Sequence, residues 1–125
     1  MTLVADPLTE KVIGCAIAVH RTLGAGLYEK VYEKCLGLEL EATGLRYAQQ
    51  VPLTLSYRGQ SIRSVYHVDI VVEDRLLVEL KTVERLTPVH HSQMLTYLRL
   101  SGIRQGLLIN FNVTRLVDGL KSFLN

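Results

Sequence analysis

A β-hairpin pattern in the middle of the chain constrains the fold most strongly. Strand-like runs cover residues 62–73 and 76–83, and Asp74 lies at the short charged break between them. Apolar-rich runs separated by a polar turn are typical of paired antiparallel strands. In a hairpin centred on Asp74, paired positions add to 148, which predicts Asp69 opposite Glu79 and His67 opposite Lys81.

The same hairpin gathers charged side chains on one face of the sheet. Strand alternation puts Glu79 and Lys81 on one face and Leu80 on the other, and the predicted pairing brings Asp69 to the first face. Two close carboxylates repel each other, and a divalent cation such as Mg²⁺ or Mn²⁺ relieves that repulsion. A surface ladder of ion pairs is the alternative, and the residue spacing alone leaves it open.

The flanking patterns predict a single α/β domain over residues 1–125. Helical spacing covers residues 10–23 and 27–43, an alternating strand follows over 51–57, and a short apolar strand lies at 106–111. Thr87 and Pro88 start a helix that Gly102 ends, and a last helix is expected over 114–123. Pro52 predicts an edge position for the first strand. The order is α-α-β-β-β-α-β-α, a four-stranded mixed sheet flanked by helices, with a right-handed crossover to a parallel fourth strand.

Composition and charge set limits on function. The formal net charge is only +2, which by itself does not indicate nucleic-acid binding. Cys15 and Cys35 are the only two cysteines, and both lie in apolar helical segments, so buried thiols in a reducing compartment are expected. The N-terminus lacks a signal-peptide pattern, and no apolar run approaches the roughly 18 residues of a membrane span. A cytoplasmic protein without a membrane segment is predicted.

Several sequence blocks resemble known families. An acidic residue followed by Glu-x-Lys, in this order of helices and strands, resembles the PD-(D/E)XK nuclease superfamily. Residues 26–32, GLYEKVY, match the G-x-x-E-x-x-Y signature of the GxxExxY protein family, and residues 88–102 and 106–111 look like later blocks of that family. The resemblance implies a PD-(D/E)XK nuclease-like core. No proline precedes Asp69, so the "PD" half of the superfamily label is absent.

The resemblance also implies roles for individual residues. Asp69 and Glu79 match the metal-binding acids, and Lys81 matches the catalytic lysine. Leu80 would supply a backbone carbonyl to the metal. Glu29 matches an acid that many members carry on the helix before the sheet, where it would be an outer or second-metal ligand.

Four further residues are candidates around this site. Gln93 matches a glutamine often found on the helix after Glu-x-Lys. His90, Gln93 and Tyr97 are spaced i, i+3, i+7 on one helix face, so they either face the site or cap the helix and close the sheet edge. His67 is a candidate phosphate contact, although a lone strand histidine is usually structural.

The signature helix carries two more residues of interest. Tyr32 lies three residues after Glu29, so it is expected either to orient that carboxylate or to pack in the core. Glu33 shares the helical face of Glu29 and is expected to be an ordinary exposed acid.

These features lead to two functional hypotheses. The first is a Mg²⁺- or Mn²⁺-dependent nuclease that cleaves DNA rather than RNA and works as a homodimer, since two active sites are needed to cut both strands together. The second is a catalytically inactive module with the same fold, used to bind nucleic acid or protein.

Overall fold

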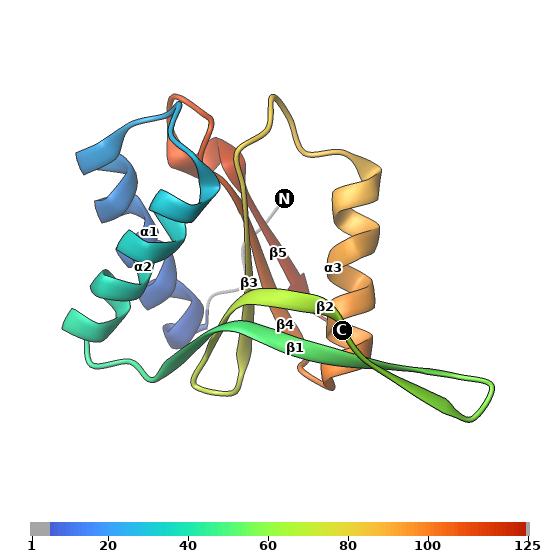
Figure 1. Cartoon of the computed structure of the whole chain (residues 1–125). Coiled ribbons are helices and arrows are strands. Elements are labelled where there is room, and N and C mark those ends of the chain that lie inside the picture. The colour runs from blue at the N-terminus through green and yellow to red at the C-terminus, as the bar shows by residue number, and fades with distance from the viewer. Residues whose placement is uncertain (1–5, 125) are drawn as a thin grey trace.

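A five-stranded mixed sheet lies between a pair of helices and a single helix in the computed structural model, which describes residues 6–124 (Figure 1). The strand order is β1-β2-β3-β4-β5, and every neighbouring pair is antiparallel except β3 and β4. The elements in chain order are α1 (Pro7–Leu23), α2 (Glu29–Ala42), β1 (Tyr47–Tyr57), β2 (Gln60–Val72), β3 (Leu76–Lys81), α3 (Pro88–Ser101), β4 (Gln105–Asn110), the 3-10 turn η1 (Leu116–Gly119) and β5 (Leu120–Leu124).

The ends of α1 and α3 follow from local capping. Asp6 caps α1 by accepting a hydrogen bond from the Thr9 N–H at 3.0 Å, so this helix begins three residues earlier than predicted. Thr87 caps α3, and Gly102 ends it with a left-handed φ of 74°, as the sequence predicted. The α3 helix carries the chain from β3 to the parallel strand β4.

The predicted hairpin register is confirmed over three residue pairs. Ile70 pairs with Val78 and Val72 with Leu76, so the paired positions add to 148. Beyond Ile70 the pairing of β2 with β3 stops. The β2–β3 register does not extend to His67 and Lys81, so the expected position of His67 opposite Lys81 is wrong. Within residues 6–124, strand β1 pairs with β2 alone, as Pro52 predicted for an edge strand.

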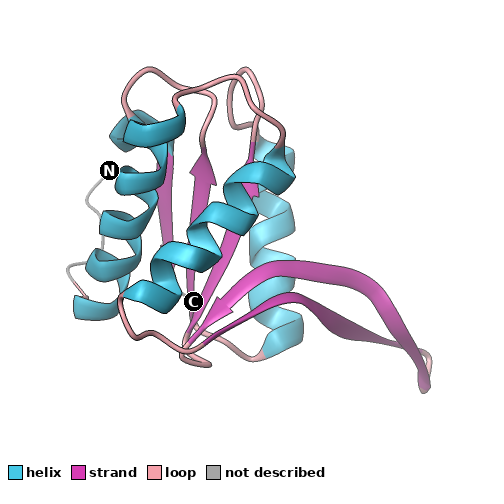
Figure 2. Ribbon diagram, turned by 60° about the vertical axis from the view of Figure 1, so that its left-hand side comes forward, coloured by secondary structure: helices cyan, strands magenta, loops and turns pink. Residues whose placement is uncertain are grey.

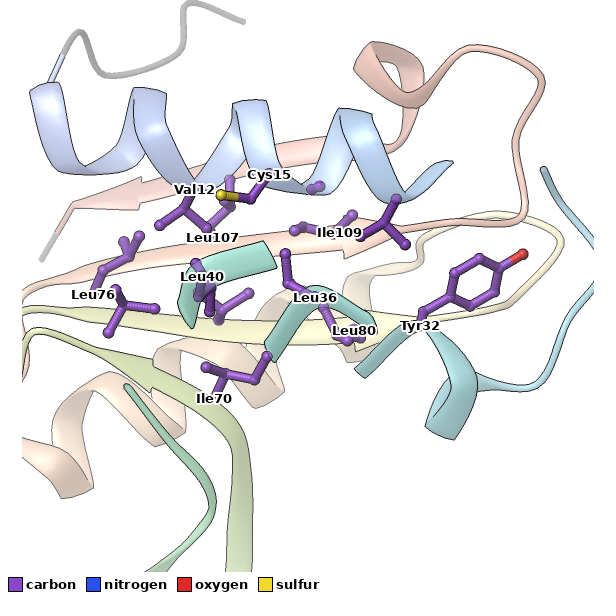
Figure 3. Close-up of a cluster of buried hydrophobic side chains, with 14 of the residues drawn as sticks. Val12, Cys15, Tyr32, Leu36, Leu40, Ile70, Leu76, Leu80, Leu107 and Ile109 are labelled. Carbon is purple, nitrogen blue, oxygen red and sulfur yellow. The ribbon is translucent and has the colours of Figure 1, made fainter. Parts of the chain in front are cut away.

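Each face of the sheet packs on its own hydrophobic core. The larger core lies under α1 and α2, where Val12, Leu36, Ile70, Leu80 and Ile109 are fully buried (Figure 3). The second core lies under α3 and includes Leu77, Met94, Leu98 and Leu108. Full burial of such side chains stabilises the fold by about 1.5–3 kcal/mol each.

The C-terminal segment differs from the sequence prediction. A helix was expected over 114–123, but the chain forms η1 and then β5, which pairs antiparallel with β4. Leu120 packs in the larger core and Phe123 in the second, on opposite faces of the sheet. Their spacing of three residues is typical of a helix, which is why a helix was predicted. The segment forms a strand instead because it pairs with the open edge of β4. The sheet therefore has five strands where four were predicted.

The β1–β2 hairpin extends well past the rest of the sheet (Figures 1 and 2). Its register shifts between Leu53 and Leu55, and Ser64 adopts a left-handed φ of 57° near that irregularity. Such bulges bend a hairpin and increase its twist. We call residues 54–65, beyond this shift, the arm. No helix within residues 6–124 is long and apolar enough to cross a membrane.

Candidate active site

Two carboxylates lie where β2 and β3 separate. The Asp69 N–H donates a hydrogen bond to Glu79 Oε1 at 2.8 Å, and the Leu80 N–H donates to Asp69 Oδ2 at 2.8 Å. These side chains take the place of backbone pairing at the opening between the strands. Asp69 is only 8% exposed and Glu79 only 4%. The surface ion-pair ladder is therefore wrong, because both acids are buried.

Lys81 lies between Glu79 of this pair and Gln93 of α3. Its ammonium Nζ donates to Gln93 Oε1 at 2.9 Å and lies 4.0 Å from Glu79 Oε2. The structure thus brings Glu79, Lys81 and Gln93 together on the α3 side of the sheet. Asp69 differs from the one-face expectation, because it points into the opening between the strands and bonds to the backbone of β3.

Burial and mutual repulsion dominate the electrostatics of the two acids. Burial, reinforced by the nearby Asp69 charge, raises the pKa of Glu79 to about 8. Burial also raises the pKa of Asp69, while the hydrogen bond from Leu80 acts in the opposite direction. At neutral pH the metal-free pair therefore retains a proton and does not carry two full charges.

Glu29 approaches the same cluster from the first turn of α2. Burial raises the pKa of Glu29, the Asp69 charge adds to that effect, and the Lys81 charge opposes it. The half-buried Glu29 carboxylate therefore interacts electrostatically with both Asp69 and Lys81.

Two residues that sequence reasoning missed complete the cluster. The Gln50 side-chain amide donates to both carboxylate oxygens of Glu33 at 3.0 Å and to Asp69 Oδ1 at 3.2 Å. Glu33 is buried, so the expectation of an exposed acid is wrong. Gln50 has a left-handed φ of 52°, which breaks the regular pairing of β1 opposite Asp69. Glu33 carried a weak signal, its position one turn after Glu29, whereas Gln50 carried none.

Tyr32 belongs to the core. Its ring is fully buried and stacks on Phe111, with centroids 4.4 Å apart. Its hydroxyl donates to the Gly24 carbonyl and accepts a hydrogen bond from the Leu27 N–H at 3.2 Å. Of the two expected roles, core packing is the observed one. These two hydrogen bonds fix the loop that leads into Glu29. They give a structural reason for the spacing of Gly, Glu and Tyr in the G-x-x-E-x-x-Y signature.

The three remaining candidates, His90, Tyr97 and His67, have different surroundings. His90 Nδ1 accepts a hydrogen bond from the Thr87 N–H at 3.0 Å, so His90 caps α3. Tyr97 is buried, and burial together with the Glu79 charge raises its pKa to about 12. His67 is exposed and the structure places it outside the cluster.

The chemistry of the donor set fits a hard divalent cation. Asp69 and Glu79 provide carboxylate oxygens, the ligands that Mg²⁺ and Mn²⁺ prefer. Within residues 6–124 no group of three or more His, Cys, Asp or Glu side chains converges on one point. Mg²⁺ usually keeps several waters and needs only one or two carboxylates from the protein, so two acids suffice.

Comparisons with known proteins identify the superfamily of this chain. Residues 6–123 match the model of the PD-(D/E)XK nuclease superfamily, and the chain belongs to that superfamily. Among solved structures, the crystal structure of SSO0001 is similar, with a TM-score of 0.60 and 18% sequence identity. The similarity covers 77% of this chain and 49% of SSO0001, so this chain spans about half the length of that protein. No curated protein sequence matches.

Proposed function

We propose that this chain is a Mg²⁺- or Mn²⁺-dependent nuclease that hydrolyses phosphodiester bonds, in DNA rather than RNA. The observation that carries the proposal is the buried Asp69–Glu79 pair with Lys81 beside it at the opening of the hairpin. Membership of the superfamily supports a nuclease-type function. We also infer membership of the narrower GxxExxY family from Gly26, Glu29 and the core role of Tyr32.

The proposed metal ligands are Asp69, Glu79 and the backbone carbonyl of Leu80, with Glu29 as an outer or second-metal ligand. A bound Mg²⁺ or Mn²⁺ would lower the pKa of a coordinated water and balance charge on the phosphate. The like-charged, buried acids supply the reason for binding a cation, because neutralising them relieves both their repulsion and their desolvation.

Lys81 is the proposed catalytic base or water-positioning residue. Gln93 Oε1 accepts one of its ammonium protons at 2.9 Å, which fixes the direction of Nζ and leaves its other protons for a water or a phosphate oxygen. Tyr97 lies beside Gln93 in the lining of one groove. A positioned acid–base group of this kind contributes about 10²–10⁴-fold to a rate.

The test is cleavage of a panel of substrates. Purified protein is incubated with single-stranded, duplex and branched DNA and with RNA, in Mn²⁺, Mg²⁺ or EDTA. We expect metal-dependent cleavage of at least one DNA substrate in preference to RNA. No cleavage of any substrate with either metal would contradict the proposal and favour the inactive binding module. A module without catalysis would not need the hydrogen bond between Lys81 and Gln93.

We also propose that the active form is a cytoplasmic homodimer. The dimer is argued from chemistry, since cutting both strands of a duplex together requires two active sites, and the location from the sequence features above. Light scattering at micromolar concentration tests the assembly, and a mass near the 14.1 kDa of one chain would contradict it.

A further inference from the structure

We infer that the arm, residues 54–65, is a DNA-binding element that grips a duplex away from the cleavage point. This inference rests on the proposed nuclease function, and it assigns part of the DNA binding to a defined surface. The arm projects from the sheet on the side that carries α3, away from α1 and α2 (Figures 1 and 2).

The arm contributes little to the hydrophobic cores. Members of the second core from this hairpin end at Leu53 and Tyr66, at the base of the arm. Beyond them Leu55 is half-buried, and three apolar side chains are open to solvent, with Tyr57 59%, Ile62 42% and Val65 44% exposed. A two-stranded ribbon without a packed face is only marginally stable in water. The arm therefore offers an exposed surface to a partner.

The charge on the arm identifies the kind of partner. No Asp or Glu occurs between residues 47 and 68, whereas Arg58 and Arg63 lie on the exposed part of the hairpin. Within residues 6–124 neither arginine forms an ion pair with a carboxylate. The Arg58 guanidinium lies 5.6 Å from the centre of the Tyr57 ring at the tip. Unpaired guanidinium groups on an acid-free surface favour phosphates.

A groove lies between the base of the arm and the residue that binds the proposed catalytic lysine. It has a volume of about 280 Å³, lies between β2 and α3, and is lined without any acid by Tyr66, Val89, Ser92, Gln93, Thr96 and Tyr97. Tyr66 stands at the base of the arm, and Gln93 accepts the hydrogen bond from Lys81. The groove therefore lies on the path that a DNA strand bound at Lys81 would follow toward the arm.

The dimensions favour a duplex. About ten residues separate Asp69 from the tip of the hairpin, which at about 3.3 Å per residue spans roughly 30 Å. One turn of B-DNA measures about 34 Å, and its major groove admits a two-stranded β-ribbon. The arm can therefore reach phosphates close to one helical turn from the bond at Lys81.

The test compares two pairs of arginines for DNA binding. Fluorescence anisotropy follows a labelled 30-base-pair duplex in EDTA, over a range of salt concentrations, so that cleavage does not interfere. The arm variant is Arg58→Gln with Arg63→Gln. The matched control, Arg21→Gln with Arg115→Gln, makes the same charge change at exposed positions around α1 and η1.

We expect the arm variant to lose about tenfold or more in affinity at 100 mM salt, and the slope of log K against log salt to become shallower by about 1.8. The control should bind like wild type. Equal binding by the arm variant and wild type, or no duplex binding by wild type, would overturn the inference. If the same protein preparations still cleave DNA when metal is added, the proposed function stands although the inference about the arm fails. If wild type neither binds the duplex nor cleaves DNA, both the proposed function and the inference are rejected.

A second copy of this chain is the alternative binding partner for the arm. The variant Tyr57→Ser with Ile62→Ser tests it by light scattering and anisotropy together. A wild-type dimer that becomes a monomer with an unchanged salt slope would overturn the inference and assign the arm to self-association. A variant of unchanged mass with weaker duplex binding would support it.

Discussion

The Asp69 N–H donates to a carboxylate oxygen of Glu79 at 2.8 Å, while Asp69 itself accepts from the backbone of the strand that carries Glu79. The two acids are thus crosslinked through the backbone of the hairpin. This arrangement holds two like-charged groups close together by hydrogen bonds. Its electrostatic cost in the metal-free protein gives rise to the predictions below.

The stability of the metal-free protein should fall as the pH rises from about 4.5 to 8. The pKa of Glu79 is raised from 4.5 to about 8 in the folded state, so the folded protein keeps a proton that the unfolded chain has released in this range. Stability decreases wherever the folded state binds more protons, here by up to about 1.4 kcal/mol per pH unit. Denaturant unfolding in EDTA at a series of pH values measures this slope.

Replacing Glu79 by Gln should remove most of that slope. The amide keeps an oxygen that can accept from the Asp69 N–H, but it neither titrates nor repels Asp69. In EDTA at pH 8 we expect the variant to melt at the same or a higher temperature than wild type. A variant with the wild-type pH dependence would mean that another group titrates in this window.

Replacing Lys81 by Met should abolish cleavage and leave the fold intact. The methionine retains an apolar stem of similar length but lacks the ammonium that contacts Gln93 and lies near Glu79. We expect at least a 100-fold loss in single-turnover rate, with circular dichroism and melting temperature close to wild type. Retention of the rate would remove Lys81 from the mechanism.

Replacing Gln50 by Ala should destabilise the protein by about 1–3 kcal/mol, because it leaves the buried Glu33 carboxylate without its amide donor. It should also slow cleavage, because Asp69 Oδ1 loses the same donor. Alanine does not relieve the left-handed backbone at this position, so the change tests the amide. The matched control is Gln49→Ala, whose amide contacts only the backbone carbonyl of Glu33. Equal effects of the two variants would contradict the role of Gln50.

Replacing Tyr32 by Phe should cost about 0.5–1.5 kcal/mol of stability, since it removes the hydrogen bonds to Gly24 and Leu27 and retains the stacking on Phe111. We expect metal affinity to change little, because the hydroxyl contacts the loop and not the acids. Chemical denaturation and Mn²⁺ titration of the same variant separate the two effects. A large loss of metal affinity would favour the alternative that Tyr32 orients Glu29.

Local patterns in the sequence predicted much of the central fold. Alternation and the break at Asp74 gave the hairpin register, and Thr87 with Gly102 gave both ends of α3. The last helix was wrong because apolar spacing cannot reveal that β4 has an open edge for β5 to pair with. Gly119 lies so close to the Asn110 carbonyl that a Cβ would clash with it, a constraint visible only in the folded structure.

The candidate site was predictable only where it lies within one hairpin. Asp69, Glu79 and Lys81 follow from strand pairing and from the resemblance to known families. The bridge from Glu33 through Gln50 to Asp69 joins α2, β1 and β2, and it depends on an unusual backbone conformation at Gln50. No periodicity in the sequence records such a contact.

Calorimetric titration of Mn²⁺ into wild type and Glu79→Gln tests the central claim most directly. The account predicts saturable binding by wild type near pH 7, with a binding heat that varies with the ionisation enthalpy of the buffer, because the metal must displace the proton held by the Asp69–Glu79 pair and the buffer takes it up. Glu79→Gln should bind at least tenfold more weakly. Absence of Mn²⁺ binding by wild type at millimolar metal, or equal binding by both proteins, would contradict the account.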